Sequence, residues 1–251
     1  MIIVAVVSSK EELNMLNSNS FKNAQDIGFS PVLIHPLQLQ ITIPRQYRSI
    51  ALSDFGAYGE INVAKACEFI QSNEHIFHVD PDEFYSVKLL NEVKNFADKL
   101  KEQEVGVIKA RYYFKHKLLN GTPWGGTKEV IKIAKKEYFL QRIHVHQRLS
   151  NKQILVNTEE FICHYWAESF REIESKHKRY LAYEGALKAS LYGSYSLFSS
   201  VSRLLRVHYG ILARIRISDG LTGLILSVIF SKYAISAELK FRSWSKIKTN
   251  G

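Results

Sequence analysis

Residues 75–84 read HIFHVDPDEF, an apolar run that ends in three acids around a proline. Residues 76–79 have the length and the apolar character of a buried strand. Asp80 and Asp82 follow directly, and Pro81 stiffens the turn between them. Because ligands in open α/β sheets bind beyond the carboxyl ends of the strands, we expect both acids to face a ligand. Two carboxylates on a short turn suit Mg²⁺ or Mn²⁺, which would hold a diphosphate.

A purely structural interpretation of the same acids stays open. Asp80 or Asp82 would then be the N-cap of the next helix, with Glu83 in its first turn, where acids are favourable. A carboxylate pair separated by one residue is common by chance, so its position after a buried strand carries the site prediction.

Short apolar runs alternate with helical patterns over the first 165 residues, which indicates an α/β layer fold. Residues 2–7 (IIVAVV) are a continuous β-branched run, typical of a strand buried on both faces. The helix predicted over 11–27 ends at Gly28, the usual glycine position after a helix. Further strands are predicted at 31–34, 105–114 and 128–134, helices at 58–70 and 87–101, and a glycine-rich loop at 120–126.

The pattern changes near residue 165, since residues 166–190 and 195–206 look helical and basic and no strand pattern returns. We therefore predict a sheet domain over 1–165 and a basic helical extension over 166–251. A length of 251 residues fits this organisation. The hydrophobic content of 46% excludes a disordered chain.

The start of the chain and its cysteines bear on its location. The N-terminus has no basic segment before its short apolar run, so it is predicted to be a core strand and not a signal peptide. Cys67 and Cys163 lie in apolar segments without paired spacing, so we expect neither a disulfide nor a zinc site. A reducing, cytoplasmic setting follows as the default.

The net charge of +10 is concentrated at one end of the chain. Residues 1–170 hold 20 Lys/Arg against 19 Asp/Glu, whereas residues 171–251 hold 14 against 5. A basic segment of this kind favours an anionic surface, either phospholipid headgroups or nucleic acid.

The longest apolar run, residues 221–230 (LTGLILSVIF), lies within this basic segment. It is shorter than the ~20 residues needed to span a membrane. Arg214 and Arg216 precede the run and Lys240 and Arg242 follow it, as in an interfacial anchor on an anionic membrane. A core helix that packs on the sheet domain and a homo-oligomer interface are the alternatives.

Several segments resemble, in the same order, those of family-2-type glycosyltransferases with the GT-A fold. The strand with its acids is similar to their "LDADE" segment, and residues 8–12 (SSKEE) to their "KNEE" opening, with Asn missing. Residues 122–126 (TPWGG) with the following IKIAKK resemble their "WGG" loop and strand, and 145–147 (VHQ) their "VHE" element, with Gln for Glu. Residues 163–165 (CHY) followed by ESKHKRY, and 219–223 (DGLTG), resemble later segments of membrane-associated members.

The resemblance implies a Rossmann-like, mixed-sheet GT-A domain with a C-terminal, membrane-surface-seeking helical extension. It implies an enzyme, hexosyltransferase-like and inverting, that moves a sugar from a nucleotide-diphosphate sugar to an acceptor hydroxyl of a surface glycan or lipid-linked saccharide. The metal would be Mn²⁺ or Mg²⁺, and the protein would lie peripherally at the inner face of the membrane in the cytoplasm. A homo-oligomer fits the same surface, and no nucleic acid is expected.

Carried over residue by residue, the resemblance makes Asp82 the main metal ligand and Asp80 a ligand of metal or ribose, with His164 as a further ligand. Ser8 and Lys10 match the opening that contacts the donor. The family's "DxGSxD" stretch after the second strand is missing here, which puts the identity of the donor in doubt. Asp54 is a stand-in near the base or ribose, or else a helix N-cap.

Acceptor-side roles follow in the same way. His146 is the candidate general base, with Glu159 and Glu160 as carboxylate alternatives, although His146 could equally be a half-buried strand residue. Trp124, Gly125 and Gly126 would form an acceptor wall, because an aromatic face stacks on a sugar and glycines permit close approach. The alternative is a mobile hairpin loop.

Two other functions remain open from the sequence. A catalytically degenerate, glycan-binding GT-A-like protein would explain the missing nucleotide stretch and the Gln147 departure. A nucleic-acid-binding protein would explain the pI of about 9.4 and the tyrosines between basic residues in the last third.

Overall fold

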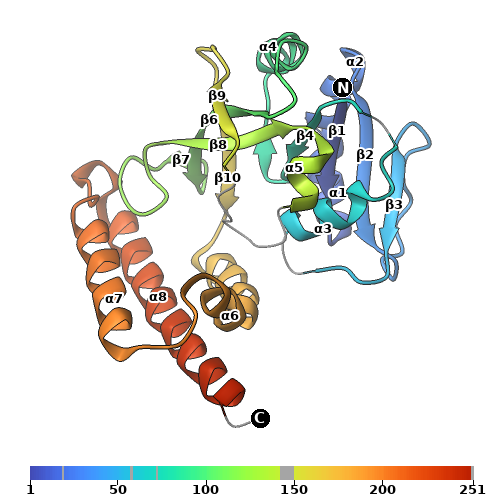
Figure 1. The fold of residues 1–251 in the computed structure, drawn as a ribbon. Helices are drawn as coiled ribbons and strands as arrows, with labels where there is room; N and C mark the ends of the chain where they lie inside the picture. The colour runs from blue at the N-terminus through green and yellow to red at the C-terminus, as the bar shows by residue number, and fades with distance from the viewer. Residues whose placement is uncertain (19, 57–58, 72, 142–149, 250–251) are drawn as a thin grey trace. The chain divides into compact units, whose positions relative to one another are not determined.

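The computed structural model describes residues 1–18, 20–56, 59–71, 73–141 and 150–249 (Figure 1). The chain divides into two compact units, Met1–Arg111 with Thr127–Trp166, and Tyr112–Gly126 with Ala167–Gly251. The predicted boundary at 165 lies next to one of these divisions. Residues 112–126 differ from the prediction, because they group with the C-terminal helices and not with the sheet domain.

The elements of the first unit alternate along the chain. In its first half they are β1 (Ile2–Val6), α1 (Lys10–Ser18), α2 (Ser20–Asp26), β2 (Ser30–Pro36), β3 (Arg48–Leu52), α3 (Gly59–Cys67), β4 (Ile76–Val79), β5 (Glu83–Phe84) and α4 (Val87–Ala97). They continue with β6 (Glu104–Phe114), β8 (Thr127–Ala134), α5 (Lys136–Gln141), β9 (Lys152–Leu155) and β10 (Ile162–Ala167).

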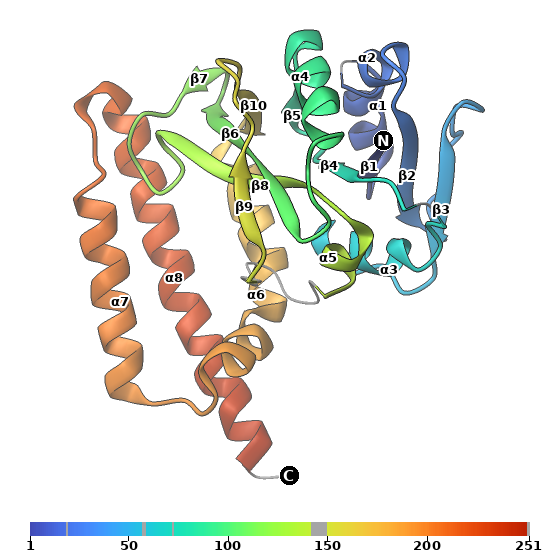
Figure 2. The same cartoon turned by 45° about the horizontal axis from the view of Figure 1, so that its top comes forward.

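The strands form one mixed sheet in the order β3-β2-β1-β4-β8-β6-β10-β5 (Figures 1 and 2). The first four of these strands are parallel to one another. β8 then runs antiparallel to both β4 and β6. The chain passes from β1 outward to β2 and β3 and returns on the other side of β1 at β4, so a topological switch point lies between β1 and β4.

Both faces of the parallel strands are covered. One buried cluster combines alternate residues of β1, such as Val4, with residues of α3 and α5, such as Val63 and Phe139. Ile3 and Ala5 point to the opposite face, because strand side chains alternate, and they are also fully buried. On that side α2 contacts β2 and α4. This is why residues 2–7 are apolar without alternation.

The second unit is helical. It contains the short strand β7 (Lys117–Leu118), α6 (Phe170–Tyr192), α7 (Leu197–Leu212), the 3-10 turn η1 (Ile217–Asp219) and α8 (Gly220–Thr249). α8 packs along α6 and beside α7, and Figure 2 shows α7 and α8 joined by a tight turn. The carboxylate of Glu238 on α8 ties the three helices together, since it accepts hydrogen bonds from Lys188 of α6 and Arg203 of α7.

The predicted fold class, a Rossmann-like α/β mixed sheet followed by a C-terminal helical extension, is confirmed. Gly28 ends the α1–α2 segment with φ +85°, as predicted. The alternative interpretation of the acids as the start of a helix is wrong. Glu83 begins the short strand β5, and Ser86 is the N-cap of α4 through a hydrogen bond from the backbone N–H of Leu89. β3 (Arg48–Leu52) is a strand that the sequence analysis did not predict.

Candidate functional site

The acids follow β4 at the switch point of the sheet. Ala5 of β1 pairs with Val79 of β4 in parallel register, so the residues after β1 and Asp80 leave the sheet side by side. Ligands in open α/β folds bind at this place, where the loops from adjacent strands separate in opposite directions. The position that the sequence predicted for Asp80 is therefore the one that the sheet topology marks as a binding crevice.

A buried lysine holds two of the carboxylates. Lys132 Nζ on β8 lies 2.7 Å from Asp80 Oδ2 and 2.7 Å from Glu83 Oε2. The side chains of Lys132 and Glu83 are 6% and 2% exposed, whereas that of Asp80 is 35% exposed. The Glu83 carboxylate is thus buried, whereas the Asp80 carboxylate is partly accessible to solvent at the edge of the sheet.

The charges of this group reinforce one another. Burial disfavours the charged form of Asp80, but Lys132 outweighs it and holds the pKa of Asp80 well below its usual range. The pKa of Lys132 is raised, because the two carboxylates outweigh its burial. The carboxylate of Glu83 also accepts hydrogen bonds from the backbone N–H of Asp80 (2.9 Å) and from the Tyr85 hydroxyl. Glu83 is therefore the fixed centre of the group.

His164 on β10 faces the remaining acid. Its Nε2 lies 3.3 Å from Asp82 Oδ1, and its Nδ1 lies 3.4 Å from Glu83 Oε1. Burial lowers its pKa, but the two carboxylates, Asp82 first, raise it to about 10. Both ring nitrogens of His164 thus face carboxylates, and its role as a metal ligand stays a prediction.

A second histidine lies beside Asp80. His78 Nε2 is buried, has no hydrogen-bond partner among the residues that the structure describes, and lies 3.6 Å from Asp80 Oδ1. Burial lowers the pKa of His78 and favours its neutral form. Gly59, the first residue of α3, approaches both side chains, since a Cβ there would lie 3.8 Å from His78 Nε2 and from Asp80 Oδ1. A helix N-terminus and an unpartnered ring nitrogen thus border the exposed face of Asp80.

The side chains at this site could bind a divalent ion only if phosphate oxygens of a ligand and water supplied the remaining coordination positions. Over the described ranges, no three His, Cys, Asp or Glu side chains are grouped to hold a metal. Lys132 holds one oxygen of Asp80, and His164 faces one oxygen of Asp82. One or two carboxylates suffice for Mg²⁺ when phosphate oxygens and water supply the other ligands. Asp80 and Asp82 fit that role, and a closed protein cage is absent from the described part of the chain.

The other residues predicted to contact the donor lie at the same edge of the parallel strands. Ser8 follows β1, and both its backbone N–H and its hydroxyl donate to the Glu12 carboxylate. Lys10 is exposed and begins α1. Asp54 follows β3 and pairs with Lys65 of α3 at 2.6 Å, with its own side chain 89% exposed. All three face solvent beyond the carboxyl ends of their strands.

The three candidate general bases differ in their surroundings. His146 lies outside the described residues. Glu160 accepts a hydrogen bond of 2.9 Å from the Ser86 hydroxyl and lies 3.7 Å from Lys88 Nζ, both at the start of α4. Glu159 is exposed. Glu160 thus has partners that hold it at α4, and Glu159 is the carboxylate open to solvent.

The predicted acceptor loop belongs to the second unit, where its glycines have a packing role. Trp124 stacks on His177 of α6 with ring centroids 5.9 Å apart and contacts Phe230 of α8 edge-on at 5.1 Å. A Cβ at Gly125 would lie 1.5 Å from the carbonyl oxygen of Gly121, and Gly126 has φ +73°. Close approach within the loop therefore explains Gly125, and the positive φ explains Gly126, without a sugar.

Residues 219–223 (DGLTG), which resemble a later segment of the family, hold this loop in place. The buried carboxylate of Asp219 accepts hydrogen bonds from the backbone N–H groups of Asn120 (2.9 Å) and Gly121 (2.6 Å). The Thr122 N–H donates to the carbonyl oxygen of Arg214 at 3.0 Å. A Cβ at Gly223 would lie 2.6 Å from Asp219 Cβ. Aspartate and glycine thus hold the start of α8 against the loop.

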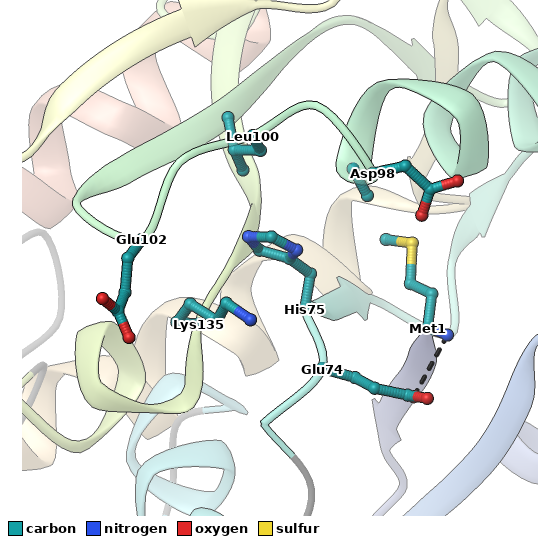
Figure 3. A pocket seen from close by; sticks show the side chains of 8 residues that line it. Met1, Glu74, His75, Asp98, Leu100, Glu102 and Lys135 are labelled. Atoms are coloured by element: carbon teal, nitrogen blue, oxygen red, sulfur yellow. Dashed lines mark ion pairs between the residues drawn. The ribbon is translucent and has the colours of Figure 1, made fainter.

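A pocket of about 470 Å³ lies at the opposite ends of the strands. Figure 3 shows His75, just before β4, pointing into it, with Lys135 and Glu102 at its rim. Its wall includes the ion pair between the Met1 amino group and Glu74 at 3.1 Å. Because α/β sheets bind ligands at the carboxyl ends, we assign the site to the acidic cluster and not to this pocket.

Sequence reasoning missed Lys132, His78 and Tyr85. The sequence contains a signal for Lys132, because it lies between Ile131 and Ile133 in a predicted strand. A lysine in such a strand is buried only when an acidic side chain pairs with it. His78 precedes the acids by two residues and shares their side of the strand. Tyr85 carries no signal of its own.

No protein-family model and no curated protein matches the chain. Among solved structures, it is similar to HddC from Yersinia pseudotuberculosis, with 12% identity, 62% of this chain and 90% of that chain covered, and a TM-score of 0.39. It is also similar to S. aureus TarS 1-349, alone (TM-score 0.37) and in complex with UDP-GlcNAc (0.40). Both TarS matches have 11% identity and cover 100% of this chain and 92% of that chain. Likenesses this distant transfer no residue's role.

Proposed function

We propose that the protein is a glycosyltransferase that moves a sugar from a nucleotide-diphosphate sugar to an acceptor hydroxyl of a saccharide. The observation that carries the proposal is the position of Asp80 and Asp82 beyond β4, at the switch point of the sheet. The ordered resemblance of the sequence to family-2-type glycosyltransferases gives this site its reaction.

The donor would lie across the carboxyl ends of the parallel strands. Ser8 and Lys10 after β1 and Asp54 after β3 would contact the nucleotide. The N-terminus of α3 at Gly59 offers backbone N–H groups to phosphate oxygens, with the neutral ring of His78 beside it. These contacts extend along the strand order β3-β2-β1-β4, the direction in which a nucleotide lies across such a sheet.

Asp80 and Asp82 would hold Mn²⁺ or Mg²⁺ together with the diphosphate, and the ion would stabilise the negative charge of the departing nucleotide. Lys132 donates a hydrogen bond to Asp80, and His164 faces Asp82, so each of the two carboxylates has a neighbour that limits its movement. Three carboxylates against two cations leave one negative charge in the cluster, which favours a further cation over a bare diphosphate. The general base stays a prediction among His146, Glu159 and Glu160.

Titration calorimetry with nucleotide-diphosphate sugars, with and without Mn²⁺, tests the proposal. The expected result is donor binding that requires Mn²⁺ and weakens at least about tenfold in Asp82→Asn, the effect of losing one charged ligand contact. Asp26→Asn, at an exposed acid of α2, is the matched control and should bind as the wild type does.

Two outcomes would contradict the proposal. Donor binding of equal strength with and without Mn²⁺ would remove the metal role of Asp80 and Asp82. The absence of binding to every donor would leave a glycan-binding protein with the same fold. Release of nucleotide diphosphate in the presence of saccharide acceptors then measures the transfer itself.

A further inference from the structure

The solvent-facing side of α7 is apolar along its whole length. Its exposed apolar residues recur at intervals of one, three and four, so they share one face of the helix. They are Leu197, Phe198, Val201, Leu205, Tyr209 and Leu212, and Phe198 is 85% exposed. The opposite side packs inward through Ser200 and Ile211. A surface helix normally shows charged residues where α7 shows these, so this face needs a partner.

The apolar face continues through the turn into α8. Ile217 is 99% exposed, and Leu221, Leu224 and Val228 on α8 are also exposed. Arg214 and Arg216 alternate with the apolar residues of the turn and are exposed as well. Figure 2 shows this turn at the end of the α7–α8 pair. We call the exposed face of α7, the turn and the exposed face of residues 221–228 the α7–α8 surface.

The charges around the α7–α8 surface are all of one sign. From residue 185 to the end of the sequence the only acids are Asp219 and Glu238. Both are buried and paired, Asp219 with the backbone of the 120–121 loop and Glu238 with Lys188 and Arg203. Over the described residues from 185 to 249, no exposed carboxylate is therefore left to balance the exposed arginines Arg206, Arg214 and Arg216.

We propose that the α7–α8 surface binds an anionic lipid membrane. The apolar side chains would enter the headgroup–acyl boundary while the arginines meet lipid phosphates. A second copy of the chain is disfavoured, because a self-complementary contact would bring arginines together without acids to pair them. Nucleic acid would satisfy the arginines but would leave the exposed leucine, isoleucine and phenylalanine side chains in water.

The membrane contact is peripheral. By length and composition α8 is apolar enough to cross a bilayer, since an 18-residue window within residues 217–245 has a mean hydropathy of 1.5, and 22% of that window is buried. However, α8 packs along the highly charged helix α6. Glu238 and its cationic partners lie between these helices, and Tyr233 donates a hydrogen bond of 2.5 Å to Glu184. A spanning α8 would take those charges into lipid, which is costly.

The turn is held in shape before it meets the lipid. Asp219 and the carbonyl oxygen of Arg214 accept hydrogen bonds from the 120–122 loop. A Cβ at Gly121 would lie 2.2 Å from that carbonyl oxygen, so the two loops are in close contact. A rigid turn loses little conformational entropy when it binds.

Sedimentation with vesicles tests the proposal without donor or acceptor, so it stands or falls independently of sugar transfer. The full chain is mixed with phosphatidylcholine vesicles with or without phosphatidylglycerol. We expect strong binding to the anionic vesicles only, reduced by salt. Ile217→Ser with Leu221→Ser should weaken it at least about tenfold, the effect of removing two large apolar contacts. Phe69→Ser, at an exposed phenylalanine of the first unit, should leave it unchanged.

Arg214→Gln with Arg216→Gln separates charge from apolar contact. This variant should lose about fivefold in anionic-vesicle binding for each arginine and should become less sensitive to salt. All substituted side chains are exposed, and circular dichroism verifies that the variants fold. High salt should release the bound protein, as a peripheral contact requires.

Three results would overturn the proposal. The first is a wild type that fails to sediment with anionic vesicles, and the second is binding that the apolar and arginine substitutions leave intact. The third is self-association in the absence of lipid that the same substitutions abolish, which would identify a second copy as the occupant. Salt-sensitive binding to oligonucleotides without binding to vesicles also counts against a membrane.

Discussion

Lys132 Nζ and Asp80 Oδ2 lie 2.7 Å apart across the antiparallel half of the sheet. The same ammonium group contacts Glu83, which is almost fully buried. A fixed protein cation therefore stands beside the acids that the sequence alone assigns to a metal. Lys132 therefore gives Asp80 and Glu83 a structural role in the sheet, in addition to the ligand-binding role proposed for Asp80.

Lys132→Met should destabilise the first unit by about 3–5 kcal/mol at pH 7, because it leaves the buried Glu83 carboxylate without its cation. Urea unfolding measures the free energy. The loss should shrink toward pH 5, since the pKa of Glu83 rises in the variant and protonation removes the unpaired charge.

Lys152→Met is the matched control. Lys152 is also a strand lysine, paired with Glu104 at 3.2 Å, but its side chain is 72% exposed. An exposed pair of this kind contributes less than about 1 kcal/mol. Equal, small losses in both variants would mean that the charge group does not stabilise the sheet.

This pair also explains what sequence reasoning could reach. Strand β4 and the place of Asp80 are local features, because an apolar run of four residues followed by acids and proline encodes both. Lys132 is 52 positions from Asp80, and only strand pairing brings the two together. At Glu83 a local pattern was misleading. The alternative interpretation that Glu83 lies in the first turn of a helix rested on a local preference, and the pairing of Glu83 with His164 between β5 and β10 overrides that preference.

The helical unit shows a different limit. Periodicity places apolar residues of a helix toward a core, and this holds for Ile211 of α7. It fails for Phe198 and Leu205, because the inward side of α7 is already taken by small and polar contacts such as Ser200 and Arg203 with Glu238. A sequence pattern shows that a helix has an apolar side, but only the packing shows that the apolar side faces solvent.

His177 should make the second unit sensitive to acid. Burial lowers the pKa of His177 to about 4, against about 6.5 in the unfolded chain. Since the unfolded state then binds the extra proton, stability falls as the pH drops below 6.5, and the loss is complete below about pH 4. The expected loss is on the order of 3 kcal/mol, because each pKa unit corresponds to about 1.4 kcal/mol.

His177→Phe keeps a ring in the stack with Trp124 and Tyr233 but cannot take up a proton. Its stability should therefore change less between pH 7 and pH 4 than that of the wild type. Tryptophan fluorescence in urea unfolding measures the difference. Parallel pH profiles for the two proteins would show that His177 does not titrate in this range.

Asp219→Ala should loosen the 120–122 loop. The variant leaves the backbone N–H groups of Asn120 and Gly121 without this acceptor, at a cost of about 1–3 kcal/mol for the buried group of Gly121 and less for the part-buried group of Asn120. Hydrogen exchange at these two amides should accelerate far more than exchange in α6. Ser218→Ala, at the exposed neighbour, should change neither. Unchanged protection at residues 120 and 121 would assign their stability to the glycine packing alone.

Gly223→Ala and Gly210→Ala separate packing from helix propensity, because both glycines lie in helices. In an open helical position alanine is favoured over glycine by about 0.5–1 kcal/mol. A Cβ at Gly210 in α7 meets nothing within 4 Å, so Gly210→Ala should gain that amount. A Cβ at Gly223 in α8 would lie 2.6 Å from Asp219 Cβ, so Gly223→Ala should instead destabilise the unit and expose the amides that Asp219 holds. Opposite signs in urea unfolding are the expected outcome. A gain in both variants would mean that the start of α8 can shift away from Asp219, and that the glycine is not needed to hold the loop.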